Sequence, residues 1–413
     1  MKKEKLLLFL LACVQFTHIV DFMIIMPLGD TLMKAFSIKP NQFSYIVSSY
    51  TFSAGIVGLI SALFIDKFDR KSMLTYCYLG FVAGTLACAL APTYYFLLAA
   101  RIFTGAFGGI LGALVLSIIG DVIPLERRSS AMGVVMAAFS AAAVFGVPTG
   151  YFIANKFSWH APFLFLSGLG VIIFFLIFYL IPPLKSHLNK TGIATNPFTN
   201  IANIFKDANQ VKALLFMMLL MFGQFTVIPF IAPYMERNVG FDKTQITYIY
   251  LVGGFFTIFT SPIIGKLADK FGRYKLFAFF ALLAIIPLYT ITNMTQTPIA
   301  IALVATTLFF IVAGGRMIPA TTMITAVVAP QNRGSFMSLN SSVQQISSGI
   351  AAFVAGIIVT ETSTGGKFIH YHYVGYIAIA ANILAIIVAY RLKVYQPKQI
   401  NQELDKQEVI NKN

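Results

Sequence analysis

Charged residues are scarce in this chain. Only 11% of its 413 residues are Asp, Glu, Lys or Arg, whereas a soluble domain has about a quarter. Hydrophobic residues make up 58%, with 40 Phe but one Trp, and the mean hydropathy is +0.79. A water-soluble protein of this length has no means of hiding so much apolar surface, so most of the chain must lie in lipid.

The usual signatures of an active site or a metal site are also missing. The three cysteines, Cys13, Cys77 and Cys88, are odd in number and fall in apolar segments, so no disulfide is expected. The sequence contains no Walker loop, no H-E-x-x-H and no Cys pair with metal-ligand spacing. An enzyme, an ATP-driven pump and a bound cofactor or metal are therefore not expected.

Twelve apolar segments are long enough, at roughly 20 residues, to cross a bilayer. We therefore expect an all-α polytopic membrane protein. The first segment has a basic start but no small-residue cleavage site, so we expect a retained helix and not a signal peptide. The twelve expected spans are 6–28, 43–65, 73–92, 94–119, 130–153, 162–182, 212–235, 245–267, 275–293, 298–325, 335–359 and 372–391.

The distribution of Lys and Arg predicts the orientation. With the N-terminus inside, 22 of the 30 basic residues lie on the cytoplasmic side and six on the outer side. The net charge of +15 is therefore a topology signal and not the mark of a nucleic-acid-binding protein. We expect a multi-pass protein of the cell membrane, with both termini cytoplasmic and its basic side against anionic lipid.

The spans divide into six and six around the longest internal loop. We expect a six-helix bundle over 1–184, a cytoplasmic linker over 185–211, a second bundle over 212–395 and a disordered tail over 396–413. In the linker, Phe198, Ile201, Ile204 and Phe205 follow helical spacing, which favours a short helix on the membrane surface; a flexible tether is the alternative.

One charged loop occurs twice, as "ALFIDKFDRK" (62–71) and "GKLADKFGRYK" (265–275). Each copy falls between the second and third span of its half, which is typical of transporters built from two parallel repeats. These loops resemble the signature loop of the major facilitator superfamily, and the resemblance covers essentially the whole chain. The matching residues are Asp66, Lys67, Arg70 and Lys71 in the first copy, and Gly265, Asp269, Gly272 and Arg273 in the second; Ala62 and Asp69 replace the glycines of the first copy.

The resemblance implies the two-bundle fold of that superfamily and a gating role for both loops. In the outward-open state, Asp66 should face the start of the eleventh helix and Asp269 the start of the fifth, latching the cytoplasmic side shut. The alternative is a short basic loop that serves topology alone.

Two charges of opposite sign lie inside apolar spans of the first half. Arg101 is about seven residues, ~10 Å, below the outer end of the fourth span, and Asp21 reaches a similar depth in the first span. A charge at this depth is costly and marks a functional site by default. We predict an Asp21–Arg101 ion pair that couples transport to protons; a static pair, or an Arg101 that reaches the outer headgroups, are the alternatives.

His18 precedes Asp21 by three residues, with Gln15 one turn further back, so these side chains share a helix face. Histidine titrates near neutral pH, so His18 is a candidate proton relay; a hydrogen-bonded packing residue is the alternative. Arg101 and Gly105 resemble the fourth-helix motif of superfamily exporters, where it is linked to proton coupling. Gly105 and the glycines 108, 109 and 112 have the spacing of close helix contacts.

The fifth span contains "FGVPTG", in which Gly146, Pro148 and Gly150 resemble the fifth-helix signature of exporters, with a departure in spacing. Proline bends a helix and glycine permits close approach, so this segment is a candidate pivot. The remaining polar residues inside spans are candidates for the central cavity or for helix–helix hydrogen bonds: Gln224, Arg316, Asn340, Gln344 and Gln345.

These features favour a monomeric, proton-coupled exporter of the drug or sugar efflux type, which moves a small neutral or lipophilic solute by rocking its two halves. The proton gradient would be its energy source. Two alternatives stay open: a proton symporter or facilitator that imports a nutrient, and a non-transporting sensor or scaffold with the same fold.

Overall fold

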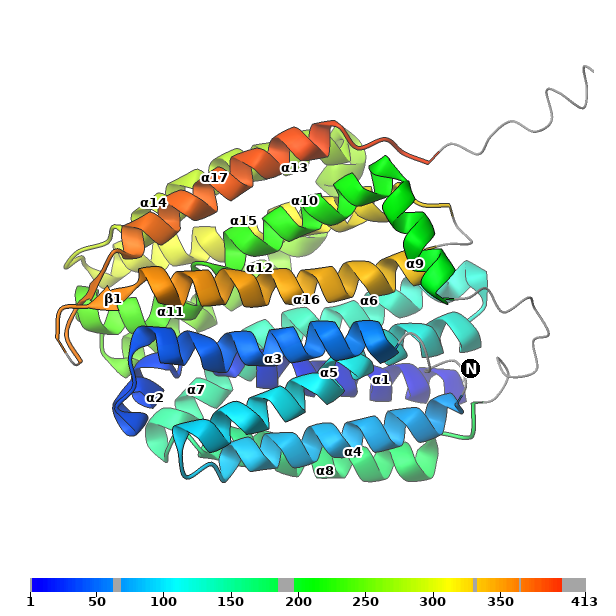
Figure 1. The fold of residues 1–413 in the computed structure, drawn as a ribbon, viewed down its shortest axis with the longest axis horizontal. Helices are drawn as coiled ribbons and strands as arrows, with labels where there is room; N and C mark the ends of the chain where they lie inside the picture. The colour runs from blue at the N-terminus through cyan, green and yellow to red at the C-terminus, as the bar shows by residue number, and fades with distance from the viewer. Residues whose placement is uncertain (1, 62–67, 185–196, 330–332, 364, 396–413) are drawn as a thin grey trace, which may run out of the picture.

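The computed structural model describes residues 2–61, 68–184, 197–329, 333–363 and 365–395. They form two helical bundles whose helices run along one common axis (Figure 1). We call the end of the molecule that carries Lys2 the inner end, and the opposite end the outer end, following the orientation that the sequence predicts. The inner end lies at the right of Figure 1.

The first half begins with α1 (Lys2–Ile24), which is followed by a short helix at the outer end, α2 (Gly29–Phe36). The remaining elements of this half are α3 (Pro40–Ser61), α4 (Arg70–Ala89), α5 (Tyr94–Val122), α6 (Leu125–Ala141), the π-helix η2 (Ala142–Gly146), α7 (Val147–Lys156) and α8 (Ala161–Leu180).

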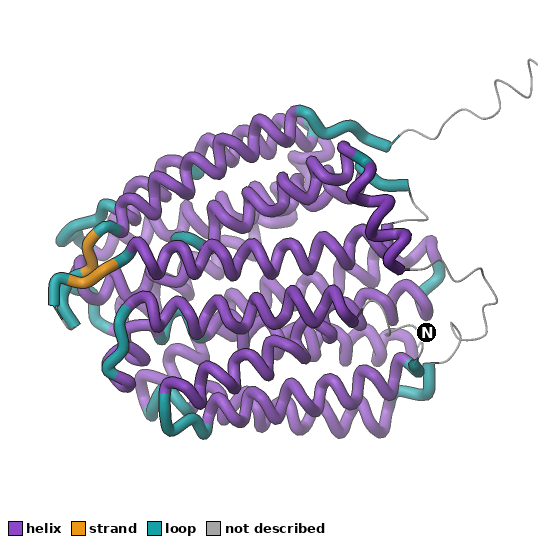
Figure 2. Tube along the Cα trace, viewed as in Figure 1, coloured by secondary structure: helices purple, strands orange, loops and turns teal. Residues whose placement is uncertain are grey.

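The second half begins after α9 (Pro197–Lys206), a helix of the linker that packs against α10 and α16 and buries Ile204. It consists of α10 (Ala208–Phe225), α11 (Ile228–Tyr234), the π-helix η3 (Met235–Val239), α12 (Lys243–Phe271), α13 (Arg273–Leu283), α14 (Ile285–Thr292), α15 (Ile299–Ala326), α16 (Arg333–Ile358), β1 (Thr360–Glu361), β2 (Phe368–Ile369) and α17 (Tyr371–Tyr390). The two strands pair antiparallel in a small hairpin at the outer end (Figure 2).

Within the described ranges, eleven helical segments are long and apolar enough to cross a membrane. The remaining expected span, 130–153, is formed by α6, η2 and α7, which follow one another without a break. Large apolar side chains on the outside of the bundles remain exposed, among them Phe9 and Phe175, as expected where lipid is the solvent. The fold therefore has the predicted two bundles of six membrane-spanning segments each.

Polar residues next to the spans begin several of these helices. Asp69 accepts a hydrogen bond from the backbone N–H of Ser72 at the start of α4, and another from Leu184 N–H. Burial raises the pKa of Asp69, but these hydrogen bonds outweigh it and leave the pKa below its usual value. Asp69, which replaces a signature glycine in the first loop, is therefore the N-cap of α4.

Glycines allow α5 to lie directly against α3. A Cβ at Gly105 would lie 2.3 Å from the Tyr50 carbonyl oxygen, and one at Gly109 would lie 2.1 Å from that of Ala54. Gly112 does not belong to this contact, because a Cβ there meets nothing within 4 Å. The small-residue spacing was thus correctly assigned to packing at Gly105 and Gly109 and wrongly at Gly112.

The two halves meet along α3 and α16. A Cβ at Gly55 of α3 would lie 2.6 Å from Ile346, and one at Gly356 of α16 would lie 1.9 Å from the Ser44 hydroxyl oxygen. Tyr45 and Phe353 stack across the same contact, with ring centroids 5.6 Å apart. A second contact joins α12 to η2 and α7, where Gly254 lies against Val144.

Substituting Gly109 with alanine should destabilise the protein, because the new methyl group collides with the α3 backbone. Overpacking typically lowers the free energy of unfolding by about 1–3 kcal/mol. The higher helix propensity of alanine raises it by up to ~1 kcal/mol, so the net effect is a loss of stability. Gly112→Ala gains the same propensity without a collision, so it is the matched control. Thermal unfolding in one detergent should show a lower midpoint for Gly109→Ala only; equal midpoints would contradict the packing shown here.

Candidate functional site

Asp21 and Arg101 form an ion pair in the interior of the first half. Arg101 Nη1 lies 2.8 Å from Asp21 Oδ2 and 3.3 Å from the Asp21 carbonyl oxygen. Thr85 of α4 donates a hydrogen bond of 3.1 Å to the other carboxylate oxygen. Both charged side chains are 0% exposed. The predicted pair is therefore present, and the alternative in which Arg101 reaches the outer headgroups is wrong.

The pair is held by three helices besides α1. The guanidinium of Arg101 lies over the Tyr50 ring of α3, with 4.2 Å between Cζ and the ring centroid. Among the described residues, Arg101 Nε and Nη2 have no hydrogen-bond partner. One carboxylate and one aromatic face thus stabilise the buried cation. Loss of the carboxylate charge would leave Arg101 with the aromatic face and the Asp21 backbone carbonyl.

His18 lies one turn from Asp21 towards the inner end and is 7% exposed. Its ring lies between Tyr50 and Phe81, with centroid distances of 6.3 and 5.9 Å. Neither ring nitrogen has a hydrogen-bond partner among the described residues. His18 is therefore a buried, packed residue, as the alternative to the proton relay predicted, but it is not hydrogen-bonded. Gly108 makes room for this group, because a Cβ there would lie 2.9 Å from His18 Nε2 and 2.7 Å from Tyr50 Oη.

The candidate pivot coincides with the π-helix η2. The backbone N–H of Val147 reaches back five residues to the Ala142 carbonyl, and Pro148, the next residue, has no N–H to donate. A Cβ at Gly146 would lie 2.2 Å from Val20, and one at Gly150 would lie 2.6 Å from Ile24. The irregular segment therefore packs closely on α1, next to Asp21.

The polar candidates of the second half do not join the Asp21–Arg101 pair. Arg316 is 2% exposed and donates from Nη1 to the side-chain oxygen Oδ1 of Asn382 in α17 at 3.0 Å. Asn382 in turn donates to the Ala281 carbonyl oxygen. The sequence analysis missed Asn382, although an Asn in an otherwise apolar span is itself a signal. Asn340 is buried, whereas four glutamines are partly buried: Gln15, Gln224, Gln344 and Gln345.

The first gating loop is only partly described. Asp66 and Lys67 lie outside the described residues. Arg70 pairs with Asp121 at the inner end of α5, at 2.9 Å, and Lys71 lies 5.7 Å from the Phe178 ring centroid. This half of the loop is therefore tied to its own bundle.

The second gating loop is exposed at the inner end. Gly272 adopts a left-handed φ of 93° between α12 and α13, which explains the glycine of the motif. Asp269 and Arg273 are exposed, and within the described ranges neither forms an ion pair. Among the described residues, Asp269 shows no hydrogen bond or ion pair with the fifth span, the contact predicted for the outward-open state.

At the outer end, by contrast, the halves are joined by aromatic contacts and ion pairs that the sequence analysis did not predict. The rings of Phe43 and Phe230 pack edge to face, 5.9 Å apart. Asp30 of α2 binds Arg237 of η3, and Tyr151 of α7 donates a 2.6 Å hydrogen bond to Glu236. The structure thus shows a state that is closed at the outer end.

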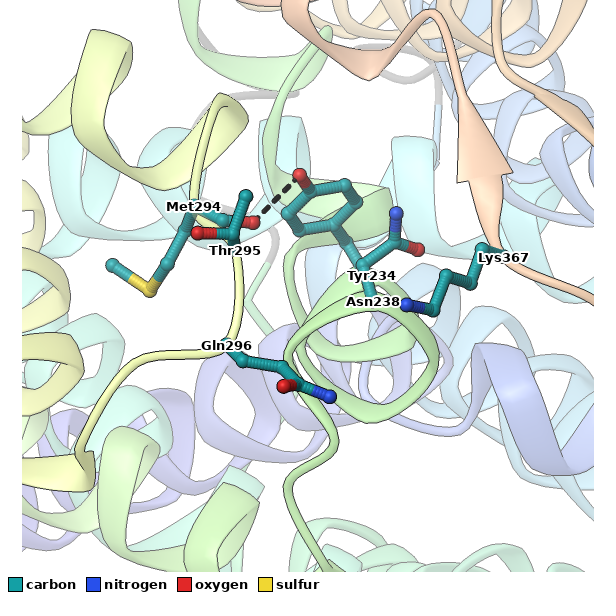
Figure 3. Close-up of a pocket in the computed structure, with 6 residues that line it drawn as sticks. All are labelled: Tyr234, Asn238, Met294, Thr295, Gln296 and Lys367. Carbon is teal, nitrogen blue, oxygen red and sulfur yellow. Dashed lines mark hydrogen bonds between the residues drawn. The ribbon is translucent and has the colours of Figure 1, made fainter.

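Two cavities lie near these contacts. One, of about 460 Å³, opens at the outer end of the second half and is polar (Figure 3). In Figure 3 the Tyr234 hydroxyl points to the Met294 carbonyl, to which it donates a 2.8 Å hydrogen bond. A second cavity, of about 30 Å³, lies between the halves; its apolar lining includes Met23, Val147 and Phe310.

Two six-helix halves, with an ion pair buried inside the first half and an outer end closed by contacts between the halves, define a membrane protein of the secondary-transporter type. The model of the Major Facilitator Superfamily matches residues 11–223 and 213–411. The chain belongs to this superfamily of transporters.

Among its relatives is the uncharacterized transporter YceJ of Bacillus subtilis (strain 168), 22% identical over 84% of this chain and 87% of that protein. A probable sugar efflux transporter of Helicobacter pylori (strain G27) is 26% identical over 65% of this chain and 66% of that protein.

Solved structures with the same fold include a D-xylose-proton symporter, with a TM-score of 0.77 and 16% identity over 94% of this chain and 97% of that one. A bacterial homolog of the human lysosomal transporter Spinster, inward-facing and unoccupied, has a TM-score of 0.73 and 16% identity over 96% of this chain and 99% of that one. At these identities the likeness shows the fold.

Removing one partner of the buried pair should cost far more stability than removing both. Arg101→Met leaves a buried carboxylate unpaired, at a cost of ~3–5 kcal/mol, whereas Asp21→Leu with Arg101→Met replaces the pair by apolar groups and should recover much of that loss. Arg127→Met is the control, because its pair with Glu4 is exposed and should contribute no more than ~1 kcal/mol. Thermal unfolding of the four proteins tests this, and additive losses would contradict a buried, mutually compensating pair.

Proposed function

We propose that this protein is a proton-coupled exporter of a small neutral or lipophilic solute, such as a sugar or a drug-like compound. The observation that carries the proposal is the Asp21–Arg101 pair, which lies wholly buried where apolar helices meet. A titratable acid that depends on one cation for its charge is suited to bind and release a proton as the helices move.

The coupling follows from the energetics of the pair. When Asp21 binds a proton, Arg101 loses its counter-charge and keeps only the face of Tyr50 and a backbone carbonyl. An unpaired buried cation is strongly unfavourable, so the helices must rearrange to hydrate or re-pair it. Protonation of Asp21 therefore favours a different arrangement of α1 and α5, and movement that separates the pair favours protonation.

Two neighbouring features supply the path and the motion in this proposal. Neither ring nitrogen of His18 has a hydrogen-bond partner among the described residues, and the ring lies one turn from Asp21, so in this proposal His18 relays the proton along α1. The segment with Gly146, Pro148 and Gly150 is the pivot, because its π-helix packs on α1 beside Asp21. The exposed second loop, with Asp269, latches the inner end when the outer end opens.

The direction and the substrate class rest on weaker resemblances. The fourth- and fifth-helix patterns resemble those of exporters, and one relative carries the name of a probable sugar efflux transporter. The predicted cavity residues include four partly buried, neutral glutamines, which suit an uncharged polar solute: Gln15, Gln224, Gln344 and Gln345. We place the protein in the cell membrane as a monomer with cytoplasmic termini, driven by the proton gradient and without a cofactor.

Asp21→Asn should abolish substrate-driven proton movement, because an amide keeps the hydrogen bonds but carries no proton to exchange. Inside-out vesicles energised acid-inside, with a pH-sensitive dye and a panel of sugars and lipophilic compounds, measure this directly. Wild-type vesicles should lose the gradient when a substrate is added, and the variant should not.

Glu4→Gln is the matched control, since Glu4 is an acid on the same helix whose partner, Arg127, is exposed. Its proton movement should equal that of the wild type. Substrate-linked proton movement in Asp21→Asn at the wild-type rate would contradict the coupling role, and accumulation of substrate against the predicted direction would favour an importer.

A further inference from the structure

The outer contact between the halves contains more buried acid than base. Asp30 of α2 is 2% exposed and binds Lys34, at 2.6 Å, and Arg237. Arg237 also binds Glu361 of the β1–β2 hairpin, at 2.8 Å. Glu236, the residue before Arg237, adds a third carboxyl group to this cluster of two cations. Within the described ranges, Glu236 forms no ion pair.

The carboxyl groups of Glu236 and Asp30 lie within hydrogen-bonding reach of each other. Two carboxylates have only acceptor atoms, so such a contact requires a proton on one of them. Burial raises the pKa of Asp30, but the hydrogen bonds from Lys34 and Arg237 outweigh it and leave the pKa below its usual value. Asp30 is thus the ionised member, and the proton belongs on Glu236.

Glu236 is also held by the first half through Tyr151 of α7, which donates its hydroxyl to Glu236 Oε1 at 2.6 Å. This donor by itself favours an ionised Glu236, whereas the nearby Asp30 carboxylate favours the neutral form. Tyr250 of α12 is 7% exposed, its hydroxyl has no partner among the described residues, and it faces Glu236. Among the described residues, the titratable and charged groups near Glu236 are Asp30, Tyr151, Tyr250, the cation Lys34 and the Arg237–Glu361 pair.

Opening the outer end would change this environment completely. Asp30 and Tyr151 belong to the first half and Glu236 to the second, so separation of the halves removes both partners at once. A glutamate in water releases its proton near pH ~4. At neutral pH, an exposed Glu236 is therefore ionised, and closing the outer end on an ionised Glu236 would bring two carboxylates together.

We propose that Glu236 is a second proton-binding site, at the outer contact between the halves, and that its protonation from the outside holds this end closed. The site is distinct from Asp21, because it lies at the surface contact of α2, α7 and η3 and not inside the first half. Closing the outer end takes up one proton at Glu236, so acid outside favours the closed state and alkaline pH favours the open state. One proton changes the ratio of open to closed molecules by up to ~tenfold per pH unit.

The distance between the two halves at the outer end tests this proposal without any substrate. Pulsed electron paramagnetic resonance measures that distance between two spin labels. One label is attached at Ser158→Cys, in the exposed turn before α8, and the other at Thr362→Cys, in the β1–β2 hairpin. The full chain, with Cys13, Cys77 and Cys88 replaced by alanine, is titrated from about pH 5 to about pH 9. The longer distance should gain population as the pH rises.

Glu236→Gln keeps a neutral, hydrogen-bonding side chain, so it should hold the short distance across the whole range. A Glu236→Gln protein with the wild-type pH response, or one that stays open, would overturn the proposal. If Glu236→Gln fails to fold, Glu236→Asp is measured in its place, and it must keep the response with a shifted midpoint; an unshifted midpoint would overturn the proposal.

Three controls separate Glu236 from the other titrating groups. Glu361→Gln, an acid that binds Arg237 within its own half, should keep the response. The triple change of His160, His370 and His372 to glutamine should also keep it, although these histidines lie at the same end. Asp21→Asn separates the two proton sites: a response lost in Asp21→Asn and retained in Glu236→Gln would reject this inference while supporting the coupling role of Asp21.

Discussion

The fold of the first half depends on one constraint: a carboxylate and a guanidinium that lie where no water solvates them must stay together. Four helices meet that requirement around Asp21 and Arg101. Thr85 of α4 donates a hydrogen bond to the carboxylate, and the ring of Tyr50 of α3 lies against the guanidinium. Glycines of α5 let the α5 backbone approach α3 closely enough for this geometry. The close helix packing and the ion pair are therefore parts of one arrangement, because the helix that supplies Arg101 packs directly against the helices that supply Tyr50 and Thr85.

The same arrangement connects the buried pair to the contacts between the halves. α1 carries Asp21 on one side and packs on the π-helix η2 through Val20 on the other, and η2 lies against α12 of the second half. At the outer end, η3 is a second π-helix, and it carries Glu236 and Arg237. Irregular helix thus occurs at two places where the halves meet, which is where a rocking motion must be absorbed.

Much of this could be predicted from the sequence, because lipid leaves few choices. Apolar length gives the spans, and an acid and a base buried at equal depth in an apolar protein must pair, which is why Asp21–Arg101 was predictable without a structure. Gly112 shows the limit of this reasoning: spacing says which residues share a helix face but not how far along the face the neighbouring helix extends.

The outer cluster was not predictable for a different reason. Asp30 and Arg237 are separated by 207 positions, and each sits in a short element at the end of a span, where charge is common and carries no special cost. Only the closed position of the two halves brings them together. Likewise, Asp269 has no ion pair among the described residues here; the latch that we propose for it belongs to the outward-open state.

The central claim is that Asp21 changes its protonation when the transporter changes state. Infrared difference spectroscopy of the purified protein, on adding a transported compound at constant pH, detects the carbonyl band of a protonated carboxylic acid directly. The measurement is made in a Glu236→Gln background, which removes the second proposed proton-binding group. We predict a band that appears or disappears with the compound in Glu236→Gln, is retained when Glu4→Gln is added and is absent when Asp21→Asn is added. An identical band after Asp21→Asn is added, or no carboxyl change during transport in Glu236→Gln, would contradict the role of Asp21.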